Sequence, residues 1–152
     1  MLSTEDFSTF GKLQLIASIQ PAHLLDDIEL LERFWEGRTH KAFPYRTLVD
    51  GGARLRLGSD CPVAPLEPWG AMAAGVSRAR VGGESWHTEQ CLTNREVYAG
   101  STWNGKVALE VGDVADLCVI ERDPLTASPD ELRAMKVFGT LIGGRWTHRE
   151  GI

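Results

Sequence analysis

The sequence predicts an α/β fold in which two parallel strands are followed by a smaller β region. Two short apolar runs, residues 15–19 and 53–57, have the length and composition of strands. Helical patterns occupy the segment between them, over residues 28–36 and 46–51. A strand–helix–helix–strand order favours a parallel pair, because the connection returns the chain to the same end of the sheet. From Asn104 onward, short apolar runs separated by turn residues indicate β structure instead.

Each of the two predicted strands ends next to a polar side chain. The run Leu15–Ile19 is compact and β-branched, which is typical of a strand buried on both faces, and Pro21 ends it just before His23. The second run has alternating leucines, which predict one apolar face, and a Gly-Ser pair then delivers Asp60 at its carboxyl end. Enzymes built on α/β barrels place reactive groups at this end of their strands. An aspartate in a Gly-Ser-Asp turn is also commonly a turn former that bonds its own backbone.

Capping and turn residues predict the remaining elements. Thr93, with Glu96 three positions later, forms a capping box that predicts a helix start. The adjacent glycines Gly143 and Gly144 predict a hairpin turn. The other expected elements are helices at 7–13 and 70–79, strands at 107–109, 115–120, 136–142 and 145–148, and a helical turn at 130–135.

Composition excludes several classes of protein. The chain has 152 residues, 43% of them hydrophobic and 24% charged, which is typical of one soluble globular domain. Its net charge of −5 and its scattered basic residues argue against a nucleic-acid partner. No apolar run approaches the roughly 18 residues of a membrane span, and residues 1–6 are unlike a signal peptide. The three cysteines form no Cys-x-x-Cys pair, so we predict no disulfide framework and a cytoplasmic location.

Five short motifs, in order along the chain, suggest a family. They are Ala17-Ser18-Ile19-Gln20-Pro21-x-His23, Phe43-Pro44-Tyr45-Arg46-x-Leu48, Gly58-Ser59-Asp60-x-Pro62-Val63, Glu110-x-Gly112-x-x-Ala115-Asp116-Leu117 and Thr140-x-x-Gly143-Gly144. The series covers nearly the whole chain and resembles the carboxyl-terminal third of the metal-dependent amidohydrolase superfamily. Within it, the resemblance is to the amidohydrolase family 3 branch of exoenzyme-regulatory and N-substituted-formamide-deformylase-like proteins.

The resemblance implies a C-terminal fragment of a (β/α)₈ TIM barrel with part of a small β-sandwich. Residues 1–103 would be the carboxyl-terminal portion of the barrel domain, with its seventh strand at 15–19 and its eighth at 54–58. Residues 104–152 would belong to the composite β-sandwich, where Asp116 has a structural role. Residues 1–13 resemble the helix after the sixth strand, so the first six strands are expected to be missing and the chain to be truncated.

The resemblance also implies a function, which is hydrolysis of non-peptide carbon–nitrogen bonds in a small amide-like molecule. Asp60 would be a ligand of a divalent metal, zinc above all, and would take a proton from the metal-bound water. His23 would contact the substrate at the pocket rim. The family's other metal ligands are absent from this sequence, so we expect no turnover from the isolated chain. A substitute site is not indicated, because the spacings of the remaining candidates match no metal-binding motif; these are His23, His40, His87, His148 and Cys61.

A second hypothesis treats the chain as a non-catalytic interaction module derived from an amidohydrolase. A two-strand parallel remnant would expose ladder edges that pair readily with another chain. The partner would be a second copy or a complementary amino-terminal part. An unrelated small α/β binding domain is disfavoured by the ordered series of motifs.

Overall fold

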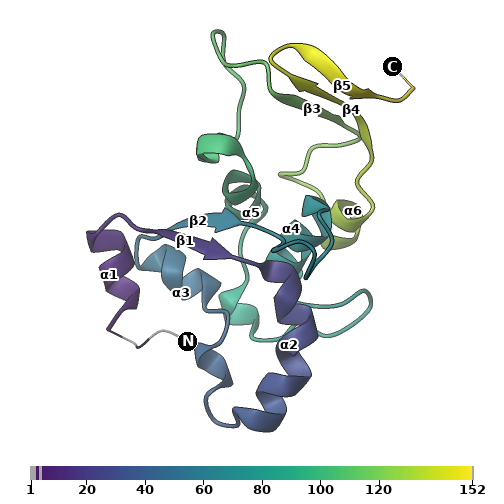
Figure 1. Ribbon diagram of the computed structural model, residues 1–152. Coiled ribbons are helices and arrows are strands. Elements are labelled where there is room, and N and C mark those ends of the chain that lie inside the picture. Colours follow the sequence, from purple (N-terminus) through teal and green to yellow (C-terminus); the bar gives the residue numbers. More distant parts are fainter. Residues whose placement is uncertain (1–2, 4, 152) are drawn as a thin grey trace.

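Two small sheets organise the fold, and the predicted α/β class is confirmed. The computed structural model describes residue 3 and residues 5–151 (Figure 1). One sheet is the pair β1–β2 and the other has the order β3–β4–β5. Figure 1 shows the three-stranded sheet at one end of the molecule, apart from β1–β2.

Strands β1 (Ile16–Ile19) and β2 (Arg54–Leu57) are parallel, as predicted, with Ile16 opposite Arg54 and Ile19 opposite Leu57. The side chains of Ala17 and Ile19 are buried, whereas those of Ile16 and Ser18 are exposed. The expectation that this strand is buried on both faces is therefore wrong for the described chain. The reason is that only the face of β1 that carries Ala17 and Ile19 packs on the hydrophobic core. Leu55 and Leu57, which lie opposite them on β2, pack against the same core.

The described residues form six α-helices. They are α1 (Phe7–Lys12), α2 (Pro21–Phe34), α3 (Tyr45–Asp50), α4 (Pro68–Ser77), α5 (Asn94–Ser101) and α6 (Pro129–Arg133). Three 3₁₀ turns lie between them, η1 (Thr39–Lys41), η2 (Thr88–Gln90) and η3 (Trp103–Gly105). The helix predicted from residue 28 starts earlier, because Pro21 has the backbone angle that the first helical position needs. His23 consequently lies in the first turn of α2.

Helix α5 covers β2 closely. Its start is the predicted capping box, in which the Thr93 side chain accepts from the Glu96 N–H. A Cβ added at Gly100 would lie 2.5 Å from Cδ1 of Leu57, so glycine allows the helix to approach the strand. Helix α4 packs against α2, α5 and α6 and is the centre of the helical layer.

The second sheet is antiparallel and comprises β3 (Leu117–Ile120), β4 (Val137–Ile142) and β5 (Arg145–Arg149). Gly143 and Gly144 form the predicted hairpin turn, with φ of +55° and +75° that glycine adopts without strain. The N–H of Gly143 donates to Oδ1 of Asp116 at 2.7 Å, which confirms a structural role for that carboxylate.

No strand forms at residues 107–109, within the part of the chain described, and that prediction is wrong. Residues 106–113 instead form a loop closed by ion pairs. The ammonium of Lys106 lies 3.1 Å from Oε2 of Glu110 and 2.6 Å from Oδ1 of Asp113. These contacts hold the segment as a local loop without a strand partner.

One hydrophobic core crosses the predicted boundary between residues 103 and 104. Ala127, Leu132 and Met135 belong to the same buried cluster as residues of α3, α4 and α5. Arg133 also donates to the Ala79 carbonyl at 2.6 Å, which joins α6 to the end of α4. The division into two domains stays a prediction. Among the described residues, no helix is long and apolar enough to cross a membrane.

Candidate functional site

Asp60 is presented by a tight turn at the carboxyl end of β2. The backbone hydrogen bonding between β1 and β2 continues one residue past the end of β2, where the Gly58 N–H donates to the Ile19 carbonyl at 2.9 Å. Asp60 then has a left-handed backbone, with φ of +54°, and its carbonyl accepts from the Val63 N–H at 2.8 Å. Within this turn, Oγ of Ser59 accepts a hydrogen bond from the backbone N–H of Cys61 at 3.2 Å. Asp60 itself is exposed, so its carboxylate faces solvent.

His23 contacts the same turn from the start of α2, the helix that follows β1. It lies half-buried in the first turn of α2, directly after β1. Its Nε2 is 3.2 Å from the carbonyl oxygen of Ser59, a contact between residues 36 positions apart. A carbonyl oxygen only accepts, so Nε2 carries the proton in this contact. The two residues assigned to the site from sequence therefore lie at one edge of the sheet, joined through Ser59.

Of the other metal-ligand candidates, Cys61 follows Asp60 in the same turn as an exposed free thiol, whereas the three histidines lie on other elements. His40 is in η1, and His148 is on β5. Both ring nitrogens of His87 have partners, with Nε2 3.1 Å from Oγ1 of Thr39 and Nδ1 3.0 Å from Oε1 of Glu89. Among residues 3 and 5–151, no three His, Cys, Asp or Glu side chains are grouped so that they could hold a metal ion.

These residues do not fit a complete metal site. A hydrolytic zinc needs about three protein ligands and an open position. Asp60 supplies one carboxylate, and the Nε2 of His23 is already used on the Ser59 carbonyl. The chemistry available at this edge from the described chain is thus one solvated carboxylate, able to bind a cation or accept a proton.

Two cavities lie away from Asp60 and His23. The larger, about 270 Å³, lies between β2 and α5 and is lined by residues that include Leu55, Arg56 and Gly100. The other, about 240 Å³, is lined by residues of α2 and α4 together with Arg133. Neither lining includes Asp60 or His23, so these two cavities are not part of the candidate site.

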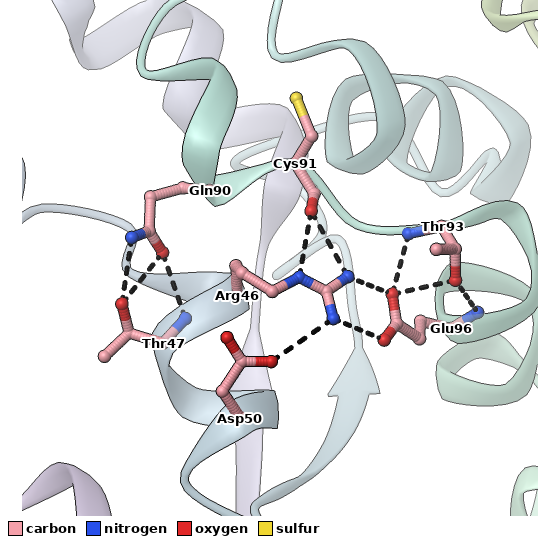
Figure 2. A network of polar contacts seen from close by, with 7 residues as sticks. All are labelled: Arg46, Thr47, Asp50, Gln90, Cys91, Thr93 and Glu96. Atoms are coloured by element: carbon pink, nitrogen blue, oxygen red, sulfur yellow. Dashed lines mark hydrogen bonds and ion pairs between the residues drawn. The ribbon is translucent and has the colours of Figure 1, made fainter.

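A polar network joins the two helices that flank β2, the strand that leads to Asp60 (Figure 2). The guanidinium of Arg46, on α3, makes a two-pronged contact with the Glu96 carboxylate, one prong being Nη1 to Oε1 at 2.8 Å. It also donates to the Cys91 carbonyl, at 3.3 Å from Nε. Oε2 of Glu96 in turn accepts from the Thr93 N–H at 2.7 Å. The network joins α3, which leads into β2, to α5, which covers it.

The network shifts the titration of its charged members. Burial alone raises the pKa of Glu96, but hydrogen bonds from Arg46 and Thr93 outweigh it, and the pKa lies below its ordinary value of 4.5. The hydrogen bond to Glu96 raises the pKa of Arg46. The pair is therefore charged at neutral pH. Sequence reasoning found Glu96 as a capping residue but missed its partner, because 50 positions separate the two and no local pattern connects them.

Comparison with known proteins gives the family. The model of the amidohydrolase family matches residues 1–148. The N-substituted formamide deformylase of Arthrobacter pascens is 29% identical over 122 residues, covering 72% of this chain and 22% of that protein. The protein LONG AFTER FAR-RED 3 of Arabidopsis thaliana is 26% identical over 148 residues, covering 90% of this chain and 25% of its own length. The chain thus spans about a quarter of the length of these curated relatives.

A solved structure supports the fold. An uncharacterized metal-dependent hydrolase from Pyrococcus horikoshii OT3 superposes with a TM-score of 0.60 at 22% identity, covering 69% of this chain and 22% of that one. The match to the family model over residues 1–148 shows that the chain belongs to the amidohydrolase family.

Proposed function

We propose that this chain is part of a metal-dependent hydrolase that cleaves non-peptide carbon–nitrogen bonds in small amide-like molecules. The observation that carries the proposal is the placement of Asp60, an exposed carboxylate in a left-handed turn at the carboxyl end of a parallel strand. Barrel enzymes position their reactive groups at this end. The names of the relatives support the reaction class, since one is an N-substituted formamide deformylase and a structural neighbour is a metal-dependent hydrolase.

In this proposal β1 and β2 are neighbouring strands of a larger barrel, and residues 104–152 contribute to a β-sandwich. The exposed face of β1 supports it, because parallel strands are normally covered on both faces. Asp60 is one ligand of a divalent metal, zinc foremost, and a proton acceptor in the complete site. Other ligands come from residues outside this sequence, so the 152 residues alone have no turnover.

A pair of assays tests the proposal. The isolated chain, supplied with zinc or manganese and N-formyl amines, is expected to show no hydrolysis above that of an Asp60→Asn variant. A chimera in which the matched 72% of this chain replaces the corresponding 22% of the deformylase is expected to be active. Asp60→Asn should lower the chimera's kcat/KM by about 10²–10⁴-fold, the range for a lost proton-transfer group.

The matched control is Asp26→Asn, another exposed aspartate, whose surface ion pair with Arg80 contributes little. It should leave the chimera's activity unchanged. Two results would contradict the proposal: full activity in the Asp60→Asn chimera, or hydrolysis by the isolated chain that Asp60→Asn abolishes.

The alternative function, an interaction module, is favoured by one specific feature. Three large apolar side chains at or just before the start of β1 are exposed and are here called the apolar patch: Leu13, Leu15 and Ile16, the last 49% exposed. Burial of such a patch against another chain is favourable. Among the described residues β1 pairs with β2 alone, so its other edge offers hydrogen bonds to a partner strand. The partner is a second copy of the chain or a complementary amino-terminal part.

Size-exclusion chromatography with light scattering tests this alternative. The metal-free chain is expected to elute at a multiple of its monomer mass, and Ile16→Glu should shift it toward the monomer by placing a charge in the apolar patch. Leu66→Glu, at an exposed leucine outside the patch, serves as the control. A compact monomer at every concentration would argue against the interaction hypothesis.

A further inference from the structure

Two hydrogen bonds join β1 and β2 beyond their ladder, at the carboxyl ends of the strands. The Gly58 N–H donates to the Ile19 carbonyl at 2.9 Å, and Nε2 of His23 donates to the Ser59 carbonyl at 3.2 Å. The first bond continues the regular pairing of the sheet. The second is made by a side chain, and it holds the peptide unit that connects Ser59 to Asp60.

That peptide unit determines the direction of Asp60. A peptide is planar, so a fixed Ser59 carbonyl also fixes the N–H of Asp60 and the axis about which its φ is measured. The φ of +54° is a left-handed value that is unfavourable for a residue with a side chain, so neighbouring contacts help to maintain it. On the far side of Asp60, the Val63 N–H binds its carbonyl at 2.8 Å. On the near side the contact is His23.

We propose that His23 is a positioning residue, which holds the Ser59–Asp60 peptide so that the Asp60 carboxylate projects from the sheet edge. Its significance for hydrolysis rests on the proposed function, whereas the conformational effect does not. This role differs from the substrate contact that the family resemblance implies, because Nε2 is occupied by the Ser59 carbonyl.

The scaffold of His23 suits such a role. The backbone N–H of His23 donates to the Gln20 carbonyl at 3.1 Å, within the first turn of α2. Pro21 and Leu24 on either side are buried, so this turn is anchored in the core. A side chain on a fixed helical turn maintains a precise contact better than one on a mobile loop.

NMR spectroscopy of the complete 152-residue chain tests the proposal directly. The ring nitrogen shifts of neutral His23 are expected to show the tautomer protonated at Nε2. In His23→Ala, the couplings and carbon shifts that report φ of Asp60 should lose their left-handed signature, and the Val63 amide should exchange faster. His23→Gln keeps an N–H donor of similar reach and should restore both. His40→Ala, at an exposed histidine in η1, is the matched control and should change neither.

Two findings would overturn the proposal. One is the tautomer protonated at Nδ1, and the other is an unchanged Asp60 in His23→Ala. If His23 only stabilised the fold, His23→Ala would lower the free energy of unfolding without changing the NMR signals of Asp60. That result would overturn the proposal.

The chimera separates this inference from the proposed function. There His23→Ala should lower kcat by about 10–100-fold, as is typical when the support of a metal ligand is removed, and His23→Gln should recover most of it. A substrate contact would instead raise KM and leave the NMR signals of Asp60 unchanged, which would overturn the proposal. If Asp60→Asn left the activity intact, the proposed function would fail, and the NMR result would still decide the role of His23.

Discussion

Leu132→Ala is expected to lower the free energy of unfolding by about 2–5 kcal/mol, the range measured for leucine truncations in protein cores. Leu132 is on α6 and is 0% exposed. Removal of its buried methyl groups loses apolar burial and leaves a cavity against residues that precede position 104. Urea denaturation followed by circular dichroism and by tryptophan fluorescence measures the loss.

The control for this substitution is Leu109→Ala, at a leucine that is 72% exposed and lies on the same side of position 104. Its effect should stay within about 0.5 kcal/mol. Because the core crosses the predicted domain boundary, both optical signals should report one coincident transition in the parent and in Leu132→Ala. Two separated transitions would show that residues 104–152 fold independently of the rest.

Arg46→Ala is expected to lower the free energy of unfolding by about 2–3 kcal/mol, since hydrogen bonds to charged groups contribute more than those between neutral groups. The substitution removes the donors to Glu96 and to the Cys91 carbonyl, both of which are half-buried and left with fewer partners. Arg46→Lys should recover only part of the loss, because an ammonium cannot make the two-pronged contact. Arg95→Ala, at an exposed arginine on α5, is the matched control and should have little effect. A loss as small as that of Arg95→Ala would contradict the inferred role of the network.

The same network predicts a dependence of stability on pH. The pKa of Glu96 is lower in the folded chain than its ordinary value of 4.5, so the ionised pair stabilises the fold fully above that pH. The contribution is lost as the pH falls through the lowered pKa, when Glu96 takes up a proton. The difference in unfolding free energy between the parent and Glu96→Gln should therefore be largest at pH 7 and shrink below pH 4.5. A difference that stayed constant down to pH 3 would contradict the assignment.

Local patterns in the sequence predicted the local features of the fold well. The two parallel strands, the capping box at Thr93 and the glycine hairpin are each specified by a few neighbouring residues, and the structure has all of them. Asp60 was expected at the end of β2 because its position depends only on the strand and the Gly-Ser pair that follows. The start of α2 was misplaced because a proline ends a strand and begins a helix equally well.

Contacts between distant segments could not be predicted in the same way. The bond from His23 to Ser59 spans 36 positions, and the pair of Arg46 with Glu96 spans 50. Both depend on how helices pack around β1 and β2, for which no pattern of neighbouring residues exists. The strand expected at residues 107–109 failed for a related reason, since an apolar run becomes a strand only where a partner strand is available.

The packing of α6 on α4 has a consequence for the chain during its synthesis. Residues Ala71–Gly75 of α4 are all buried in the finished fold, in part by α6. Helix α6 follows α4 by about 50 residues, which at roughly 5–20 residues per second corresponds to an interval of about 3–10 seconds. Throughout that interval the alanine-rich helix has left the ribosome before the segment that covers it. The nascent chain therefore carries an uncovered apolar surface near its middle, a natural binding site for chaperones until α6 has been synthesised.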